Sequence, residues 1–247
     1  LPFARCLKEK APQPARVVSA GGVNINVAVA PVLRGDACIG AFATVQRFND
    51  AENRQNELRS QLLHKGYRAK YTFDDVVGQS PALLRGITIL KKRSLTPLPV
   101  LLIGETGTGK ELFAQSIHNA SARKNQPFIA VNCGALVESL LESELFGYEK
   151  GAFTGALSSG KLGIIESAEN STLLLDEVNC IPRNLQAKLL RVLETKTILR
   201  VGSVKPRPVN FRLISAANVD LAQCVRDGTF RSDLYYRLDV IPITIPP

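Results

Sequence analysis

The sequence has little that would place the protein in a membrane, a secreted scaffold or a zinc site. No apolar run approaches the ~20 residues that cross a bilayer, and no basic segment followed by an apolar one marks a signal peptide. The five cysteines are scattered without a C-x-x-C pair, and with only two histidines a zinc site is disfavoured. Unpatterned cysteines in odd number fit free thiols in a reducing compartment. We therefore expect a cytoplasmic protein without membrane contact.

Positive charge is not concentrated as nucleic-acid binding would require. The net charge is +9, but residues 1–70 hold 11 basic and 5 acidic side chains, against 20 and 17 in residues 71–247. The larger part is nearly neutral, so charge does not predict DNA binding. The sequence lacks an initial Met and ends at Pro247 after a strand-like run, which suggests a fragment of a longer protein.

The first 70 residues combine a β-hairpin with a helix. Residues 23–30 and 38–47 are β-rich and flank turn residues at 34–36, which predicts a hairpin from the end of a sheet. Helix formers follow over 50–65, between an Asp50 N-cap and Gly66. Heptad-like spacing there fits a short coiled coil, and a solvated linker helix is an equal alternative.

Beyond Tyr71 the sequence alternates strands and helices. Apolar runs typical of buried strands lie at 99–103, 128–131, 172–175 and 211–216. Helix-forming stretches lie at 110–119, 136–146 and 183–195. Continuous apolar strands separated by helices predict an α/β fold with a parallel sheet covered on both faces. Ligands of such sheets bind at the carboxyl ends of the strands.

The run at 99–103 leads directly into a glycine-rich loop and then a helix, as in a P-loop. The candidate phosphate-binding residues are Gly104, Glu105, Thr106, Gly107, Thr108, Gly109, Lys110 and Glu111. Backbone N–H groups and the helix N-terminus would cradle phosphates, and Lys110 would reach the β- and γ-phosphates. Glu111 replaces the usual Mg²⁺-binding hydroxyl, so the metal needs other ligands; Thr106 and Thr108 both remain open.

Two carboxylates at the end of the apolar run 172–175 fit a Walker B motif. Asp176 would orient Mg²⁺, directly or through water, and Glu177 would polarise the attacking water. Asn218, after the run 211–216, is a candidate sensor of the γ-phosphate or the lytic water, with a turn cap as the alternative. Asn132 could contact Glu177 or simply form a turn.

Two arginines and one loop complete the candidates. Arg231 and Arg237 could reach a neighbouring subunit's γ-phosphate as arginine fingers, whereas salt bridges with nearby aspartates are the simpler reading. Gly151, Ala152, Phe153, Thr154, Gly155 and Ala156 form a hexapeptide between the phosphate-binding motifs. One aromatic ring among small residues suits a mobile tip that contacts a partner; a plain glycine-rich turn is the alternative.

These stretches together closely resemble the AAA+ P-loop NTPase domain of bacterial enhancer-binding proteins, which remodel sigma-54 RNA polymerase. The matching segments are 104–121, 128–133, 142–156, 172–178, 185–194 and 228–247. The hexapeptide is very specific to that family, which also carries Glu after the P-loop lysine. The similarity covers about 71–247.

The resemblance implies a role for each matching position. Lys110, Asp176 and Glu177 would form the hydrolysis core with ATP and Mg²⁺, and Asn132 would be a switch residue acting through Glu177. Arg231 and Arg237 would act in trans within a ring, expected to be a hexamer. Phe153 and Thr154 would contact sigma-54. Val77 and Gly78 resemble the segment near the adenine.

Outside 71–247 the resemblance is weaker. Residues 1–48 look like the end of a PAS-like sensor domain, and 49–70 would be the linker helix. The family's helical lid and its C-terminal enhancer-DNA-binding domain are absent. The segment after Walker B, Val178-Asn179-Cys180, departs from the family's usual Ile-Gly-acid, and Asn218-Val219-Asp220 lacks its common Arg.

The function that follows is an ATP-driven activator of sigma-54 RNA polymerase. A nucleotide-dependent scaffold that binds partners without activating sigma-54 is the alternative, which the intact hexapeptide disfavours. Sequence-specific DNA binding has no support within these residues.

Overall fold

The computed structural model describes residues 6, 9, 11, 13–20, 23–34, 37–47, 61–62, 66–153, 157 and 159–246. The chain divides into two compact units, one up to Ser60 and one from Gln61 onward. The predicted linker helix falls almost wholly outside the described residues, so it stays a prediction.

The first unit is a three-stranded antiparallel sheet. Its strands are β1 (Gln13–Ala20), β2 (Val23–Arg34) and β3 (Ala37–Arg47), in that order. The predicted hairpin is confirmed as β2 and β3, while β1 was not predicted. Val27 and Val29 of β2 are buried with Cys6, and Ala41 and Ala43 pack against them. The PAS-like identity of this unit remains a prediction.

The second unit is built on a five-stranded parallel sheet. Its strands are β4 (Val100–Ile103), β5 (Phe128–Asn132), β8 (Thr172–Asp176), β11 (Arg212–Ala217) and β12 (Pro242–Thr244). The order is β12-β4-β11-β8-β5, and every neighbouring pair is parallel. The expected α/β class and parallel sheet are confirmed. Because all strands run the same way, Ile103, Asn132, Asp176 and Ala217 end at one edge.

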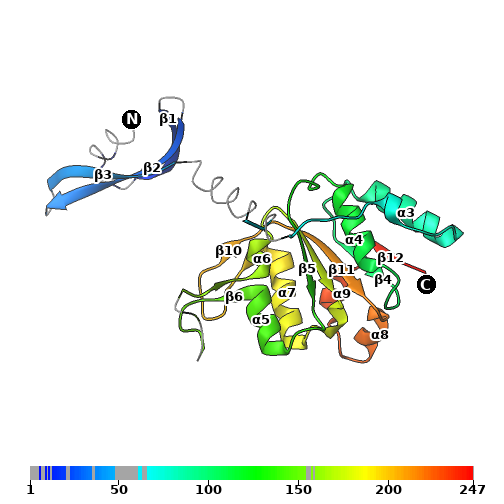
Figure 1. Ribbon diagram of the computed structural model, residues 1–247. Helices are drawn as coiled ribbons and strands as arrows, with labels where there is room; N and C mark the ends of the chain where they lie inside the picture. The colour runs from blue at the N-terminus through cyan, green and yellow to red at the C-terminus, as the bar shows by residue number, and fades with distance from the viewer. Residues whose placement is uncertain are drawn as a thin grey trace. The chain divides into compact units, whose positions relative to one another are not determined.

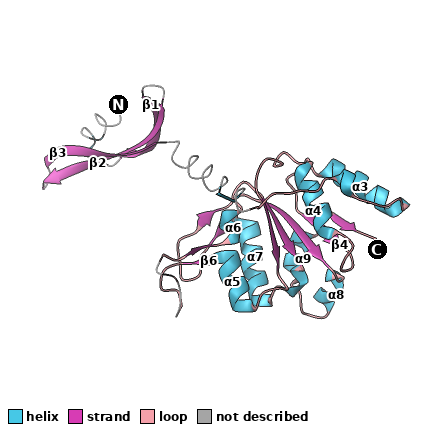
Figure 2. Cartoon of the chain, viewed as in Figure 1, coloured by secondary structure: helices cyan, strands magenta, loops and turns pink. Residues whose placement is uncertain are grey.

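Helices alternate with these strands along the chain. They are η1 (Phe73–Asp75), α3 (Pro81–Arg93), α4 (Lys110–Asn119), α5 (Glu138–Phe146), α6 (Ile164–Ser167), η2 (Val178–Cys180), α7 (Arg183–Thr195), α8 (Leu221–Arg226) and α9 (Ser232–Leu238). Figure 1 shows α5, α6 and α7 grouped on one side of the strands and α3 and α4 on the other. Figure 2 separates the helices from the connecting loops.

Two short ribbons lie outside the main sheet. β6 (Gly147–Tyr148) pairs with β7 (Lys161–Leu162), and β9 (Thr197–Ile198) pairs with β10 (Arg207–Pro208). Both pairs are antiparallel. The β6–β7 ribbon forms the base of the hexapeptide loop.

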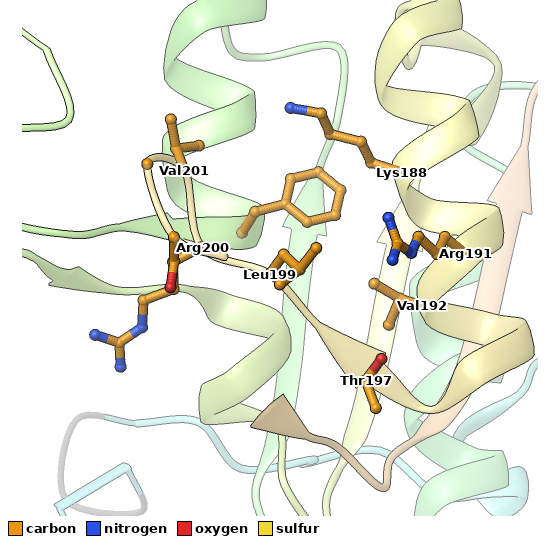
Figure 3. Close-up of a pocket in the computed structure, with 10 residues that line it drawn as sticks. Lys188, Arg191, Val192, Thr197, Leu199, Arg200 and Val201 are labelled. Carbon is orange, nitrogen blue, oxygen red and sulfur yellow. The ribbon is translucent and has the colours of Figure 1, made fainter. Parts of the chain in front are cut away.

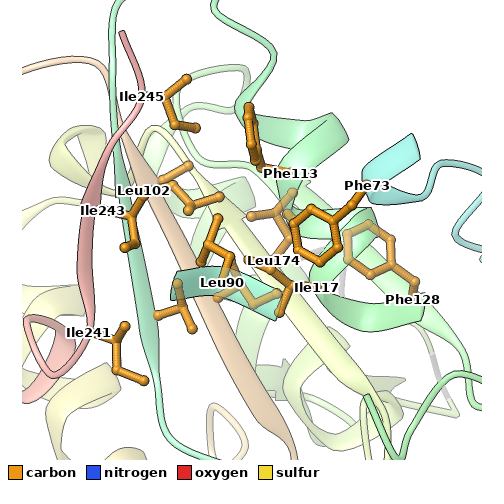
Figure 4. Close-up of a cluster of buried hydrophobic side chains, with 14 residues drawn as sticks. Phe73, Leu90, Leu102, Phe113, Ile117, Phe128, Leu174, Ile241, Ile243 and Ile245 are labelled. Carbon is orange, nitrogen blue, oxygen red and sulfur yellow. The ribbon is translucent and has the colours of Figure 1, made fainter. Parts of the chain in front are cut away.

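Alternate residues of the strands build a core under α3 and α4. Val100 and Leu102 of β4 contact Phe113 and Ile117 of α4 in one buried cluster, together with Leu90 of α3. Figure 4 shows Ile241, Ile243 and Ile245 along the edge of this cluster, beside Leu102. Leu101, between Val100 and Leu102, is also fully buried, so both faces of β4 are covered. This packing explains the uninterrupted apolar run.

The helix α3 was not predicted, although its start is well marked. Ser80 is the N-cap, its side chain accepts a hydrogen bond from the Leu83 N–H (3.3 Å), and Pro81 occupies the first turn. In the part of the chain that the structure describes, no helix is long and apolar enough to cross a bilayer.

Candidate nucleotide site and partner loop

The glycine-rich loop joins the end of β4 to the start of α4, as predicted. Gly107 (φ 90°) and Gly109 (φ 83°) adopt left-handed backbone, which residues with a Cβ resist. Gly109 is the N-cap of α4 and supplies no side-chain hydrogen bond. The first N–H groups of α4 therefore face the loop without a side-chain cap, an arrangement that favours an anion there.

Lys110 is the first residue of α4, and its side chain contacts the loop and is only 8% exposed. Its ammonium donates to the carbonyls of Gly104 and Glu105, both at 2.7 Å. The Thr108 hydroxyl donates to the Glu105 carbonyl at 2.9 Å. Of the two threonines left open as metal ligands, Thr108 is therefore engaged within the loop, whereas Thr106 lines the cavity described below.

The Glu111 carboxylate is hydrogen-bonded to a neighbour on α4. Its Oε1 accepts a hydrogen bond from Nε2 of Gln115 at 3.0 Å. Oε1 of Gln115 in turn accepts from the backbone N–H of Lys70 at 2.7 Å. The carboxylate that replaces the usual hydroxyl is thus part of a packing contact between α4 and the segment before η1.

The two acidic residues lie where β8 ends, between β11 and β5. The Glu177 N–H donates to Oδ1 of Asp176 at 2.9 Å. Glu177 itself has left-handed backbone (φ 52°, ψ 47°), an uncommon conformation for a residue with a side chain. Such local strain is often found at functional sites.

Asn132 ends β5 and pairs in register with Asp176 of β8. Its Oδ1 accepts hydrogen bonds from the N–H groups of Gly134 (2.8 Å) and Ala135 (3.0 Å). The hydrogen bonds of the described residues include none between Asn132 and Glu177. In this state Asn132 therefore forms the turn that the sequence left open as its alternative.

Asn218 follows β11, the strand between the P-loop strand and the strand of Asp176. Its Oδ1 is buried and has no hydrogen-bond partner among the described residues. Asp220, rather than Asn218, caps α8 by accepting from the Ala222 N–H at 2.8 Å. A buried, unsatisfied amide oxygen at this edge favours contact with a ligand or ordered water over a capping role.

Two cavities meet at Gly107 and Gly109. One, of about 250 Å³, is lined by Thr106, Gly107, Gly109, Lys110, Glu111, Asp176 and Glu177. The other, of about 360 Å³, is lined by Val76, Val77, Gly78, Gln79, Ser80, Leu83, Gly107, Thr108, Gly109, Leu112, Phe113, Ile245 and Pro246. The first cavity thus brings five of the predicted phosphate-binding residues together with Asp176 and Glu177, whereas Thr108 lines only the second cavity and Gly104 and Glu105 line neither. Val77 and Gly78 line the second one.

The predicted finger arginines line neither cavity. Arg231, at the N-cap of α9, forms a bidentate pair with Asp233 (3.1 and 2.7 Å). This pairing raises the pKa of Arg231 and lowers that of Asp233. Nη2 of Arg237 donates to the Leu193 carbonyl at 3.1 Å. Within one chain the salt-bridge alternative describes Arg231, and both arginines lie beside α7.

Phe153 of the hexapeptide rests on Tyr148 of β6. The rings meet edge-on, with centroids 4.9 Å apart at 65°, and Phe153 remains 47% exposed. A Cβ on Gly202 would lie 3.0 Å from Cβ of Ala152, so the β9–β10 connection passes closely over the loop. Gly151, Ala152 and Phe153 are described; the predicted contacts of Thr154, Gly155 and Ala156 lie outside the described residues.

An ionic network fastens the base of this loop to the β9–β10 ribbon. Arg200 donates to both oxygens of Glu166 (2.8 and 2.9 Å). Arg207 contacts Glu166 (3.2 Å) and Glu149 (2.8 Å). The hydrogen bond to Glu166 raises the pKa of Arg200. Glu149 directly follows Tyr148, so the network fixes the point where the loop begins.

A further cavity of about 290 Å³ lies between α7 and the segment after β9. Figure 3 shows Lys188 and Arg191 on α7 across from Leu199 and Val201. Lys188 is paired with Glu142 of α5. The cavity borders Gly202, and thus the hexapeptide loop, but contains no predicted site residue.

Some residues near the site are close to it in space but were not predicted from the sequence. Gly134 lies against Oε2 of Glu177, and Cys180 Sγ is 4.0 Å from the same oxygen. Tyr148 and Glu149 were quoted only as part of a matching segment. Among the described residues, no group of three or more His, Cys, Asp or Glu side chains is arranged to hold a metal ion. A metal at Asp176 would therefore need ligands from nucleotide and water.

Comparison with known proteins gives the family of the chain. The family described as the sigma-54 interaction domain matches residues 76–244. The putative uric acid sigma-54-dependent regulator UacR of Escherichia coli is 51% identical over 174 residues, 70% of this chain and 29% of its own length. RocR of Bacillus subtilis, a transcriptional activator, is 46% identical over 217 residues, 88% of this chain and 46% of its own.

Among solved structures, NtrX from Brucella abortus superimposes with a TM-score of 0.64 at 34% identity, covering 79% of this chain and 42% of that one. NtrX has also been solved with ADP and with ATP. The chain spans 29–46% of the length of the curated relatives named here.

Proposed function

Because the chain belongs to the sigma-54 interaction domain family, we propose that it binds and hydrolyses ATP to activate transcription by sigma-54 RNA polymerase. The observation that carries the proposal is the convergence of Lys110, Asp176 and Glu177 on one cavity beside a P-loop. As a partner of RNA polymerase, the protein would act in the cytoplasm.

In this proposal ATP would occupy both cavities, with its phosphates in one and its adenosine in the other. Phosphates would lie in the cavity of Lys110, where the open N-terminus of α4 and the ammonium favour negative charge. The adenosine would lie in the cavity of Val77 and Gly78, next to Phe113 and Leu112. On binding, Lys110 would exchange its bonds to the Gly104 and Glu105 carbonyls for phosphate oxygens.

Asp176, Glu177 and Asn218 would each have a separate role in hydrolysis. Mg²⁺ held by Asp176 would neutralise developing phosphate charge. Glu177 would accept a proton from the attacking water, as a general base. The unsatisfied Oδ1 of Asn218 would accept a hydrogen bond from that water.

Asn132 would report the nucleotide state. It now holds the turn at Gly134 and Ala135, and its amide is adjacent to the strand that carries Asp176. Binding of a γ-phosphate would draw Asn132 toward Glu177, and α5, which follows this turn, would transmit the change to the hexapeptide loop.

Arg231 and Arg237 would complete a neighbour's site in a ring, with a hexamer as the expected form. In the isolated chain Arg231 is paired with Asp233, so ring assembly would exchange that partner for the neighbour's phosphate. Phe153 and Thr154 would contact sigma-54. Enhancer DNA would be bound by a part of the protein that is not among these residues.

The test measures ATP turnover and sigma-54 binding with an ATP analogue. Glu177→Ala should lower kcat by about 10²–10⁴-fold, the usual contribution of a general base, while ATP still binds. Thr154→Ala should hydrolyse ATP but fail to bind sigma-54. Turnover in Glu177→Ala equal to that of the wild type would refute the role of Glu177 as general base. Analogue binding without any sigma-54 binding by the wild type would favour the scaffold function.

A further inference from the structure

Gln186 of α7 is a polar side chain with no exposed surface. Its Nε2 donates to the carbonyls of Ile181 (2.8 Å) and Thr229 (3.1 Å), and its Oε1 accepts from the Arg231 N–H (2.8 Å). Both N–H groups of the amide and its oxygen are therefore used. A buried amide is retained at low cost only when its partners are fixed in this way.

These three bonds join two parts of the proposed site that are far apart in sequence. Ile181 is the C-cap of η2, the turn that follows Glu177 directly. Arg231 is the N-cap of α9. A neighbouring contact runs in parallel, since Nη1 of Arg183 donates to the Gly228 carbonyl.

We infer that Gln186 is a positioning residue for Arg231, holding the arginine's backbone in register with the turn after Glu177. The inference rests on the proposed function, in which Arg231 acts on the nucleotide of the adjacent subunit. Gln186 therefore connects the turn after Glu177 to Arg231 of the same subunit. In the ring, that Arg231 would act on the nucleotide of the adjacent subunit.

Loss of the amide would remove the Gln186 partner from the buried Ile181 carbonyl, and from the part-buried Thr229 carbonyl and Arg231 N–H. The chain between Thr229 and Arg231 would then shift, and the guanidinium would be misplaced at the neighbouring site. A misplacement of about 1 Å costs roughly a hundredfold in rate. The subunit's own nucleotide cavity contains neither Gln186 nor Arg231, so ATP affinity should be unchanged.

The experiment uses Gln186→Leu, and Gln186→Glu as a second variant of the same shape. The glutamate keeps the acceptor for the Arg231 N–H but loses both donors. Gln223→Leu is the control, because Gln223 on α8 is exposed and, among the described residues, its side chain forms hydrogen bonds only with Arg226 and Asp227. For each variant, ATP affinity, KM, kcat and the thermal midpoint are measured.

Mixed rings then separate a trans effect from a local one. Gln186→Leu alone should lower kcat by about a hundredfold with KM unchanged. Glu177→Ala subunits hydrolyse ATP very slowly but carry a well-placed arginine, so Gln186→Leu subunits mixed with them should regain turnover. The benchmark for regained turnover is a mixture of Arg231→Ala and Glu177→Ala subunits. In unmixed rings, the kcat of the double variant Arg231→Ala/Gln186→Leu should be no lower than that of Arg231→Ala.

The outcomes are distinct. If the benchmark mixture regains turnover but the Gln186→Leu mixture does not, or if the two substitutions are additive, the inference is wrong. If the benchmark itself fails, or the wild type does not hydrolyse ATP, the proposed function is wrong. If Gln186→Leu does not fold, Gln186→Glu decides in the same mixtures, and wild-type kcat in folded Gln186→Glu overturns the inference.

Discussion

The carboxylate of Glu177 lies directly against the bare Cα of Gly134. A Cβ built on residue 134 would overlap Oε2 of Glu177, and it would also lie 3.4 Å from Oδ1 of Asn132. Because Gly134 has no side chain, the side chains of Glu177 and Asn132 have room to approach each other.

Gly134→Ala should displace the Glu177 carboxylate and lower kcat by about 10²-fold, within the range expected for a misplaced general base. ATP affinity should stay at the wild-type value, because Gly134 lines neither cavity. Turnover and binding of a fluorescent ATP analogue are measured together. Gly40→Ala is the control, since a Cβ there meets no atom within 4 Å. Equal kcat for the two variants would contradict the clash.

The contact between Phe153 and Tyr148 can be followed optically. The chain has no tryptophan, so Phe153→Trp introduces a single indole at the loop. Packed on Tyr148, its emission should be blue-shifted, and adding Tyr148→Ala should shift it toward the value for indole in water. Tyr148→Phe retains the ring and should retain the blue shift. The same emission maximum in all three backgrounds would mean that the rings do not meet in solution.

The ion network should contribute to stability because its central pair is largely buried. The side chains of Arg200 and Glu166 are 13% and 17% exposed. Glu166→Gln should lower the free energy of unfolding by about 1–2 kcal/mol, the size of a lost charged hydrogen bond. Asp74→Asn, in an exposed pair with Lys91 at 3.9 Å, should change it by less than about 0.5 kcal/mol. Urea titrations compare them, and equal effects would show that the network adds nothing.

His118 should make stability depend on pH. It is buried, its Nδ1 lies 2.9 Å from the Thr172 hydroxyl, and burial lowers its pKa from 6.5 to about 4. Nearby Arg212 also disfavours the charged form. Between these values the unfolded chain binds a proton that the folded chain does not, so stability is full above pH 6.5 and falls as the pH drops toward 4.

The loss over this window should amount to at most about 3 kcal/mol. Chemical unfolding is measured between neutral pH and the folded pKa for the wild type and for His118→Gln. The variant should show a flatter profile in this window, whereas His64→Gln, which leaves His118 in place, should retain the wild-type slope. A wild-type slope in His118→Gln would assign the dependence to other groups.

The sheet and its loop motifs were predictable because their signals are local. A strand buried on both faces is rich in apolar residues, and the signal is clear in β4 (VLLI) and in residues 173–175 of β8. It is weaker in β11, which also buries Arg212 and Ser215, and in β5, where Ala130 is exposed. The P-loop is equally local, since its glycines and Lys110 are consecutive. By contrast, Arg207 and Glu149 are distant in sequence, and no pattern connects an arginine with one of many possible carboxylates.

The behaviour of Asn132 shows a different limit. Its residue type suits a turn as well as a switch, and the hydrogen bonds to Gly134 and Ala135 depend on where those N–H groups lie. The strand β1 was missed because its sequence, QPARVVSA, shows no regular alternation of apolar and polar residues. The helix α3 could have been predicted, because Leu83, Ile87 and Leu90 follow a helical spacing and all pack on the core cluster.

The segment before η1 is attached to α4 by more than its passage through the fold. Besides the contact of Gln115 with the Lys70 N–H (2.7 Å), Nδ2 of Asn119 donates to the Tyr71 carbonyl at 2.7 Å. Gln115 also holds Glu111, one residue after Lys110. A displacement of residues 67–71 would therefore be transmitted through these hydrogen bonds to α4, the helix that begins at Lys110.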